Sequence, residues 1–516
     1  MFGNDRSQLQ TGYRNQKGSG TSYLRNTIRA RVYSGNAEIE EKLTQAQLHW
    51  KYYNNIHWAK NNDQLLSFNY CRAVIDKVNN FMIGKNGFEI NIYDTYGDEL
   101  PETLEKPFEG LLEYNWRMNK KKNFLHNLLQ MGSITGDAYV FVYPDTDKGY
   151  VKCTILDTRR VVPTFINGDT SQLKSVRVVK PLGYNEKDYI QKVEEYDSTK
   201  TMTYYVKDAE EDAQKFEYKE TEHNYGFIPI VHIENIPNSD GYGGKSDMVD
   251  IVKINKIFNE MSVDVKNIID YYAQPTTVIT GGTVGQLKRG LGQIWSGLPA
   301  EASVSNLSLG EDLSAANGYL DRLKQAIHDL SGVPEEVLSK VQHISNTSAA
   351  ALQMLYQPII QVSDKKSCTY GEGIENLHSM IVTVYSKFIS DHPLFVKLNT
   401  AKGERDIPKF TNRFKAEVVW KYNLPSDRLG MLNEAAIELS NKVGSRREIM
   451  ERLGKKNIPK LITEIESDTE KEIEEAKAKM PPQQFGNNEG QEANQGGSEG
   501  GSNPSGGGEQ KEQETE

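Results

Sequence analysis

One long amphipathic segment constrains the fold of this 516-residue chain more than any other feature. From Ser246 to Tyr272 the apolar residues recur at spacings of three and four, which is the pattern of a helix that buries one face. Because an α-helix rises 1.5 Å per residue, this segment predicts a rod roughly 40 Å long. A rod with one apolar face needs a neighbour to cover that face.

The two faces of this predicted helix differ in chemistry. The apolar stripe consists of Ile254, Ile257, Phe258, Met261, Val265, Ile268 and Tyr272. The opposite face is polar and consists of Lys253, Lys256, Asn259, Glu260, Lys266, Asn267 and Asp270. A glycine-rich segment follows, and then a second predicted helix, YLDRLKQAIHDL, which ends where Gly332 and Pro334 interrupt it.

The segment before the long helix, DGYGGKSD from Asp240, resembles a phosphate-binding loop but lacks its spacing. A P-loop has a glycine five residues before its Gly-Lys-Ser, and Ser239 occupies that position. The dinucleotide fingerprint fails as well, because Ser246 stands where its third glycine belongs. We therefore expect a flexible turn into the helix, with Ser246 as the N-cap and with Asp247 and Asp250 favouring the positive helix end.

Composition and charge disfavour several function classes. The three cysteines form no CxxC pair and the nine histidines include no HExxH, so no metal site is expected. The only G-x-S-x-G match, Gly496–Gly500, lies in a glycine-rich tail and not between a strand and a helix, so no catalytic site is expected. No apolar run approaches the roughly 18 residues of a membrane span, and no secretory signal is visible, which favours an intracellular product. A net charge of -10 argues against a protein that coats nucleic acid.

The rest of the sequence up to residue 424 is expected to mix helices and strands. Residues 1–35 are polar and dotted with glycine, and indicate a mobile arm. From about Asn69 to Glu234 the pattern is α+β, with helix, glycine turn and strand occurring twice in that order. A long helix is predicted from Asn346 to about Ser390, kinked at Pro358. A strand with alternating apolar residues follows at 414–422.

The C-terminal part is predicted to contain three helices and a tail. Two of the helices are indicated by capping boxes, Ser445 with Glu448 and Ser467 with Glu470. Residues 481–516 contain almost no apolar side chain and should be disordered.

Two clusters have both a functional and a structural interpretation. The predicted helix NAEIEEKLTQAQLHWKYYNNIHWAK carries aromatic residues that could stack on bases, although core packing or a subunit contact is favoured. The run RMNKKKN contains Arg117, Lys120, Lys121 and Lys122 and could meet nucleic acid or form a solvated helix face.

The order of these parts resembles the portal proteins of tailed bacteriophages, which form the ring at the capsid vertex through which DNA enters and leaves. Three consecutive portal parts, namely a wing strand, the first stem helix and the start of the clip, are matched in this chain by one stretch. That stretch is IPIVHIENIPNSDGYGGKSDMVDIVKINKIFNEMSVDVKNIIDYYAQPTTVITG. The end of the second stem helix, the tunnel loop and the start of the kinked wing helix are similar to DLSGVPEEVLSKVQHISNTSAAALQMLY. An N-terminal wing segment is matched by the stretch YCRAVIDKVNNFMIGKNGFEI. The crown is matched by the stretch LPSDRLGMLNEAAIELSNKVGSRREIMERLG. The resemblance spans about Asn36 to Lys479 and rests on the shared order of the parts.

This resemblance implies an α+β portal fold with an α+β wing, a long-helix stem, a small α/β clip and a helical crown. The implied regions are a flexible N-terminal arm at 1–35, the wing at 36–245, stem helix 1 at 246–273, the clip at 274–318, stem helix 2 at 319–333, the tunnel loop region at 334–345, a long kinked wing helix and strand at 346–424, the crown at 425–480 and a disordered tail at 481–516.

The resemblance also implies partners and sites. The chain would form a dodecamer that conducts double-stranded DNA during packaging and ejection, docks the terminase large subunit and a head-completion or adaptor protein, and meets major capsid and scaffolding proteins. Its location would be the virion, after assembly in the host cytoplasm, with no cofactor, metal or membrane. The residues expected to face DNA in the tunnel loop are Lys340, Gln342 and His343. The channel-facing stem candidates are Lys253, Lys256, Glu260, Arg322 and Lys324, and the clip candidates for terminase or adaptor contact are Lys288, Arg289 and Trp295.

Two other function classes remain as alternatives. An oligomeric scaffolding or adaptor protein of the phage head would leave the glycine-rich clip and the helix interruption at Gly332 unexplained. A packaging ATPase is disfavoured because Ser239 breaks the phosphate loop.

Overall fold

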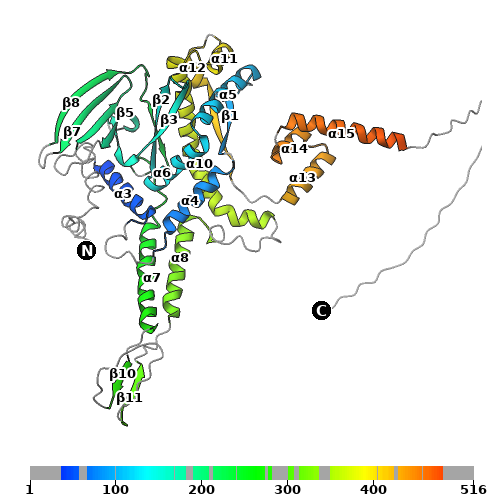
Figure 1. Ribbon diagram of the computed structural model, residues 1–516. Coiled ribbons are helices and arrows are strands. Elements are labelled where there is room, and N and C mark those ends of the chain that lie inside the picture. Colours follow the sequence, from blue (N-terminus) through cyan, green and yellow to red (C-terminus); the bar gives the residue numbers. More distant parts are fainter. Residues whose placement is uncertain are drawn as a thin grey trace, which may run out of the picture. The chain divides into compact units, whose positions relative to one another are not determined.

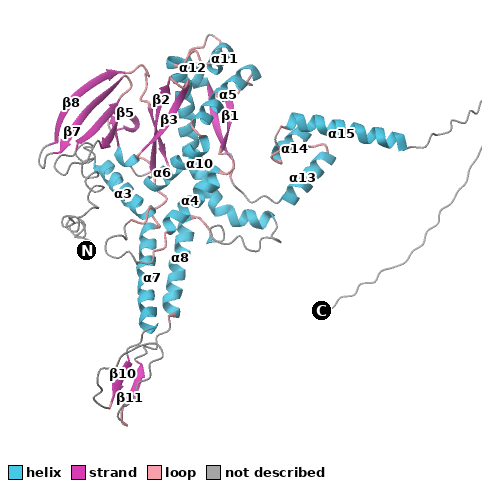
Figure 2. Cartoon of the chain, viewed as in Figure 1, coloured by secondary structure: helices cyan, strands magenta, loops and turns pink. Residues whose placement is uncertain are grey.

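The computed structural model divides the chain into two compact units, Met1–Ser426 and Asp427–Glu516, each of which is described by itself. The described residues are 37–56, 67–85, 87–98, 100–167, 169–181, 190–208, 213–239, 241–273, 277–281, 300–306, 313–335, 349–403, 405–422, 428–455 and 457–479. The expected N-terminal arm and C-terminal tail lie outside these residues. Helices and strands are mixed, as the sequence predicted (Figure 1, Figure 2).

Within the described residues, the first unit contains the predicted helices and three further helices, at 102–118, 393–402 and 407–413, that were not predicted from the sequence. The helices are α3 (Ala37–Tyr53), α4 (Tyr70–Ile83), α5 (Glu102–Met118), α6 (Lys121–Thr135), the 3₁₀ turn η1 (Thr158–Arg160), α7 (Val252–Ala273), α8 (Ser314–Ser331), α10 (Ala349–Phe388), α11 (Pro393–Lys402) and α12 (Ile407–Arg413). The 40-residue α10 runs through Pro358 without a break in the helix assignment. Gly332 ends α8 in the left-handed conformation, φ 64°, which glycine adopts without a steric penalty.

The described strands form four separate antiparallel sheets. The strands are β1 (Phe88–Asp94), β2 (Asp137–Asp145), β3 (Tyr150–Leu156), β4 (Val161–Ile166), β5 (Asp169–Pro181), β6 (Ile190–Tyr196), β7 (Lys200–Asp208), β8 (Ala213–Glu222), β9 (Ile230–Glu234), β10 (Thr277–Thr280), β11 (Ser303–Asn306) and β12 (Phe414–Trp420). Five of them form a meander in the order β4-β5-β6-β7-β8, and three pair as β3-β2-β9. The other pairs are β10 with β11 and β1 with β12.

The main core of the first unit lies where α10 crosses the sheet β3-β2-β9 and the pair β1-β12. Strand β2 is buried on both faces along its first half, so its side chains do not alternate there between a buried and an exposed face. A second core joins α3, α4 and α10 to the start of α7. Figure 1 shows α7 and α8 side by side, leading from this core towards β10 and β11.

The aromatic helix α3 packs into the protein, which supports the structural interpretation of its aromatic residues. Tyr52 and Tyr53 are buried, and the Tyr53 hydroxyl donates to Asp76 at 2.6 Å. His49 is also buried, with Nδ1 3.0 Å from the carbonyl oxygen of Ile134. These contacts leave the three rings inside the unit and not available for stacking on bases.

The lysine run at the start of α6 is neither a continuous helix nor a uniformly solvated face. α5 ends at Met118 and α6 begins at Lys121, so the run spans the turn between two helices. Lys121 Nζ donates to the carbonyl oxygen of Phe88 at 2.5 Å and lies 3.8 Å from the centre of the Phe88 ring. Lys120 and Lys122 are exposed.

The second unit contains the three predicted helices, α13 (Arg428–Ser440), α14 (Arg446–Arg452) and α15 (Ile458–Lys479). The first capping box is confirmed, because the backbone N–H of Glu448 donates to the Ser445 hydroxyl at 3.1 Å. The second is wrong, because Ser467 lies inside α15 and its hydroxyl donates to the carbonyl of Glu464.

Candidate functional site

The helix pair α7–α8 carries the described part of the predicted DNA-facing site. On α7, Lys253, Lys256 and Glu260 are all exposed, and Lys256 Nζ lies 3.7 Å from Glu260 Oε1 on the next turn. A pair of exposed charges at this spacing stabilises the helix by only a few tenths of a kcal/mol, roughly 0.3–0.5. The charges of α7 therefore remain available to solvent or to a ligand.

On α8 the two candidate side chains differ in their surroundings. Arg322 is exposed. Lys324 is partly buried, and its Nζ donates to Glu335 Oε1 at 2.5 Å. This hydrogen bond to Glu335 raises the pKa of Lys324 above its ordinary value. Lys324 thus joins α8 to the segment just beyond Gly332.

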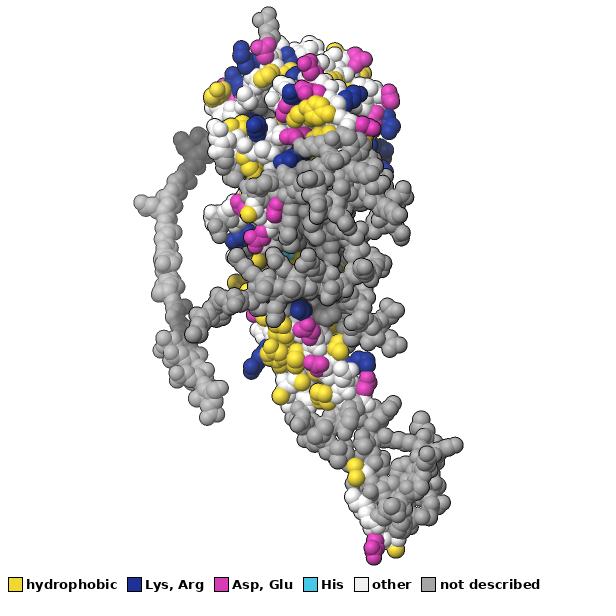
Figure 3. Space-filling model, turned by 90° about the vertical axis from the view of Figure 1, so that its left-hand side faces the viewer, with side chains coloured by type: hydrophobic (Ala, Val, Ile, Leu, Met, Phe, Trp, Pro, Cys, Tyr) yellow, Lys and Arg dark blue, Asp and Glu magenta, His cyan; other side chains and the backbone are white. Residues whose placement is uncertain are grey.

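The apolar stripe of α7 is covered in part. Phe258 and Val265 are buried, and the ring of Phe258 packs edge-on against Phe68 and Tyr70. Other apolar side chains of the pair are exposed, namely Ile257, Ile268, Ile269, Tyr319 and Leu330. Figure 3 shows hydrophobic side chains gathered on this exposed surface of the helix pair. Contiguous exposed apolar patches are typical of interaction surfaces.

One residue assigned to the polar face of α7 is buried instead. The side chain of Asn259 is 1% exposed; its Oδ1 accepts from the backbone N–H of Phe68 at 2.7 Å, and its Nδ2 donates to the carbonyl of Phe68 at 3.1 Å. Asn255, one turn earlier, donates to the same carbonyl and accepts from the backbone N–H of Cys71. These two amides satisfy backbone groups just before α4 and in its first turn, so this side of α7 faces the core.

The segment before α7 does not form an N-cap at Ser246. α7 begins at Val252, and a turn intervenes. The buried Ser246 hydroxyl lies 2.9 and 2.8 Å from the carbonyl oxygens of Ser133 and Ile134 at the end of α6, and accepts from the backbone N–H of Met248. Ser246 therefore fixes the segment to α6.

The glycine segment uses its own backbone groups inside the protein. The N–H of Gly244 donates to Asp137 Oδ1 at 2.8 Å, and its carbonyl accepts from Lys42 Nζ at 3.0 Å. A Cβ atom on Gly244 would lie 2.5 Å from the carbonyl oxygen of Gly136, so only glycine fits there. A phosphate loop needs free N–H groups. The N–H group of Gly244 is not free, because it donates to Asp137.

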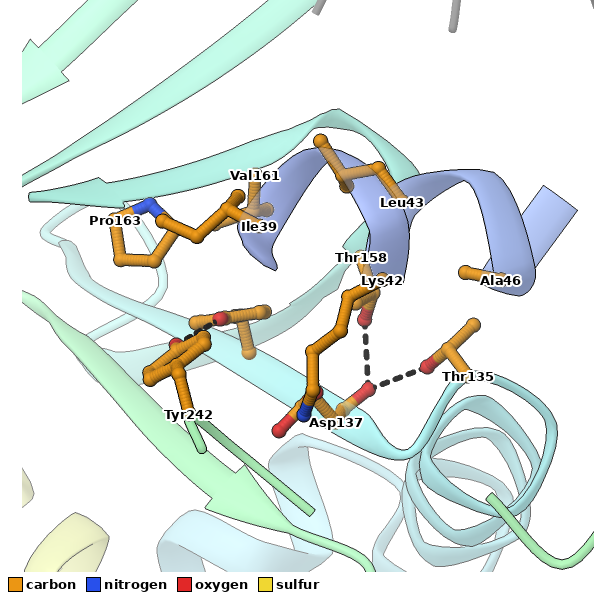
Figure 4. Close-up of a pocket in the computed structure, with 11 residues that line it drawn as sticks. Ile39, Lys42, Leu43, Ala46, Thr135, Asp137, Thr158, Val161, Pro163 and Tyr242 are labelled. Atoms are coloured by element: carbon orange, nitrogen blue, oxygen red, sulfur yellow. Dashed lines mark hydrogen bonds and ion pairs between the residues drawn. The ribbon is translucent and has the colours of Figure 1, made fainter. Parts of the chain in front are cut away.

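A small cavity lies beside this segment, between α3 and the start of β2 (Figure 4). Its volume of about 20 Å³ suffices for one water molecule and is far below that of a nucleotide site. Asp137, on its floor, is 4% exposed and is paired with His232 Nε2 at 2.8 Å and Lys42 Nζ at 3.2 Å. Burial raises the pKa of Asp137, but His232, Lys42 and the Gly244 N–H outweigh burial and lower it.

A buried ion pair adjoins the same segment. Lys366 of α10 is 0% exposed, and its Nζ lies 2.5 Å from Oδ2 of Asp247, which is 9% exposed. The Lys366 ammonium also donates to the Ser133 hydroxyl at 2.8 Å. No local pattern indicates this contact, because Lys365 and Lys366 form a basic pair of the kind found on helix surfaces.

A family model, phage portal protein of the SPP1 Gp6-like type, matches residues 35–479. The chain belongs to this portal protein family. The family is structural and not catalytic. No curated protein matches the chain.

Among the solved structures that resemble this portal-family chain, three each cover 74% of it. The neck of an empty gene transfer agent particle, computed with C6 symmetry, has a TM-score of 0.39 and 12% identity over 89% of that chain. The virion of a native gene transfer agent particle has a TM-score of 0.35 and 13% identity over 88% of that chain. The neck of the native particle, computed with C12 symmetry, has a TM-score of 0.38 and 12% identity over 89% of that chain.

The remaining portal candidates lie outside the described residues. They are Lys340, Gln342 and His343 of the expected tunnel loop, and Lys288, Arg289 and Trp295 of the expected clip. Among the residues that the structure does describe, no group of three or more His, Cys, Asp or Glu side chains could hold a metal ion. Within the same residues, no helix is both long and apolar enough to cross a membrane.

Proposed function

We propose that this chain forms the dodecameric portal ring at one vertex of a phage-like capsid, where it is the channel for DNA packaging and ejection. The observation that carries the proposal is the portal family match over residues 35–479. The helix pair α7–α8 supports it, because its exposed apolar side chains need a cover that a neighbouring copy in a ring would provide.

In this proposal the chain has the regions of a portal subunit. Residues 36–245 form the wing, 246–273 and 319–333 the two stem helices, 274–318 the clip and 334–345 the tunnel loop region. The long kinked wing helix and its strand take up 346–424, and the crown takes up 425–480. The two short strands β10 and β11 then belong to the clip, and α13, α14 and α15 to the crown.

The charge of the chain suits a conduit for DNA. Twelve chains at -10 each carry a formal charge of -120. Duplex DNA carries a negative charge about every 1.7 Å, so an acidic ring repels it and lets it pass without gripping it. The basic side chains proposed to face the channel, Lys253, Lys256, Arg322 and Lys324 on the stem and Lys340 in the loop, are local exceptions.

The proposed partners follow from the position at the vertex. The clip, with Lys288, Arg289 and Trp295, would dock the terminase large subunit during packaging and a head-completion or adaptor protein afterwards. The outer surface would meet major capsid and scaffolding proteins. Assembly would take place in the host cytoplasm, and the mature location would be the virion.

Particle mass and symmetry test the proposal directly. Twelve copies of a 58.4 kDa chain make a particle of about 700 kDa. We expect light scattering to give this mass and electron microscopy to show rings with a central channel in end-on projections. A chain that stays monomeric across concentrations and salts would overturn the proposal, and particles without a channel would favour a scaffolding or adaptor protein.

The packaging ATPase remains the disfavoured alternative. Ser239 breaks the phosphate loop, and Gly244 has its N–H and carbonyl engaged by Asp137 and Lys42. ATP binding at millimolar nucleotide, measured by calorimetry, would reopen that alternative.

A further inference from the structure

One face of α10 meets the end of α8. Pro358, Val362, Lys366 and Tyr370 follow at intervals of four residues, so they lie on one face of the helix. A Cβ atom built on Gly332, where α8 ends, would lie 2.7 Å from Cγ2 of Val362 and 3.6 Å from the carbonyl oxygen of Pro358. The backbone at the end of α8 therefore packs directly on this face.

The same face of α10 holds the segment that leads into α7. Lys366 pairs with Asp247, five residues before α7 begins at Val252. Tyr370, one turn further along α10, donates its hydroxyl to Oδ1 of Asn235 at 3.0 Å. Asn235 in turn donates to Oδ1 of Asp247 at 2.7 Å. Both oxygens of the Asp247 carboxylate are thus connected to α10, one directly and one through Asn235.

A buried ion pair of this kind need not add net stability. Replacing such a pair by apolar residues of similar volume is often neutral or stabilising, because the desolvation of two charges offsets their attraction. Removing one partner alone is strongly destabilising, because the other charge stays buried. Lys366 is fully buried and the side chain of Asp247 is only 9% exposed, so α10 cannot slide past the start of α7 without exposing or separating two charges.

We propose that this face of α10 links the start of α7 rigidly to the end of α8, so that the two helices move together. A displacement of α10 is transmitted to the start of α7 through Lys366 and Asp247, and to the end of α8 through Val362 and Gly332. The coupling is a property of the single chain. Its use, to tilt both stem helices of the channel at once, rests on the proposed function.

Hydrogen exchange of the full-length protein tests the coupling. Gly332→Ala disturbs the end of α8, because it adds a clash with Val362 and an unfavourable positive φ. With the ion pair intact, we expect this variant to speed amide exchange at residues 247–255 by about tenfold or more, because local unfolding of that segment becomes more frequent. In a chain that also carries Lys366→Met and Asp247→Leu, exchange should still rise at 325–335 but not at 247–255. An equal response at 247–255 with and without the ion pair would overturn the proposal.

Two further variants keep the result interpretable. Lys106→Met removes the lysine of an exposed ion pair with Glu102 on α5 and should leave the transmission unchanged. If the double replacement fails to fold, Asp247→Asn keeps the acceptor oxygen, removes the charge and should reduce the response at 247–255. The mass of each variant is measured in parallel. A wild-type chain that forms no ring refutes the proposed function, while the exchange pattern still decides whether α10 links the movements of α7 and α8.

Discussion

The indole Nε1 of Trp116 donates a hydrogen bond to Nε2 of His378 at 2.8 Å. Because a tryptophan N–H can only donate, Nε2 of His378 must be unprotonated, and the proton lies on Nδ1. Nδ1 is 2.9 Å from the carbonyl oxygen of Ala416 and donates to it. A neutral histidine thus joins α5, α10 and β12 in the main core.

This arrangement predicts that stability falls in mild acid. Burial, with a smaller contribution from the nearby Lys121 charge, lowers the pKa of His378 from 6.5 to about 4. The unfolded chain therefore binds the proton more readily between these values, so stability is full above pH 6.5 and falls as pH drops towards 4. The expected loss attributable to this residue is roughly 3 kcal/mol.

Urea unfolding between pH 7.5 and 4.5 checks this expectation. His378→Gln is the matched variant, because its amide can accept from Trp116 and donate to Ala416 without titrating. Other groups titrate in both proteins, so the difference between the two pH profiles isolates His378. Identical pH profiles would show that His378 does not carry the effect.

A second prediction concerns the contact between the end of α6 and the glycine segment. Gly136 has φ +90°, and a Cβ there would lie 2.6 Å from the carbonyl oxygen of Gly244. Gly97 has a similar φ of +79° with nothing within 4 Å. We expect Gly97→Ala to cost about 1 to 2 kcal/mol from the backbone alone. Gly136→Ala should cost a further 1 to 3 kcal/mol, approximately, from the clash.

Chemical denaturation of these two alanine variants separates the cost of the backbone conformation from the cost of the clash, because only Gly136→Ala has both. Equal losses of unfolding free energy would mean that the glycine segment moves aside without cost. In that case Gly136 would be needed only for its backbone conformation.

A third prediction tests whether the exposed face of the helix pair is an interface. Ile269 on α7 is 50% exposed in the isolated chain. Ile269→Lys should leave the chain folded but lower the proportion of ring in light scattering, because the charge would be buried between neighbours. Val396→Lys, on α11 and 46% exposed, is the helical control and should assemble normally. Unchanged ring formation by Ile269→Lys would place the subunit contact elsewhere.

The fourth prediction concerns the expected tunnel loop. Lys340 would meet a phosphate as a screened point charge worth about 1 kcal/mol or less, repeated in every copy of the ring. Lys340→Glu should therefore assemble normally but reduce the length of packaged DNA or its retention, with a larger effect at low salt. Lys106→Glu on α5 is the charge-matched control. Full packaging and retention by Lys340→Glu would move the proposed DNA contact to Arg322 and Lys324.

The sequence predicted the elements whose signal is local. The stripe of α7, the stop of α8 at Gly332 and the box at Ser445 all depend on residues within a turn or two of one another, and the structure contains each of them. The box at Ser467 has the same local signal. It fails because α15 already runs through it.

The errors come from contacts with residues distant in sequence. Asn259 has the spacing of a solvent-facing residue, but its amide bonds the backbone of Phe68, 191 positions earlier. Ser246 has the spacing of an N-cap, but α6 holds its hydroxyl. Lys366 looks like a surface lysine, and its partner Asp247 is 119 positions away. A pattern of neighbouring residues carries no information about partners so far away in the sequence. The buried polar contacts around the glycine segment could therefore not be predicted.

The pairing of β1 with β12 sets the order in which the first unit can be completed during translation. The side chains of Asn91 and Glu417, which face each other across this pair, are 326 positions apart. Strands β4 to β8, in contrast, pair with their neighbours in the chain and can form soon after synthesis. At roughly 5–20 residues per second, β1 waits about 15 to 65 s for its partner. The ribosome therefore carries a chain whose meander is complete while one side of its main core is still open.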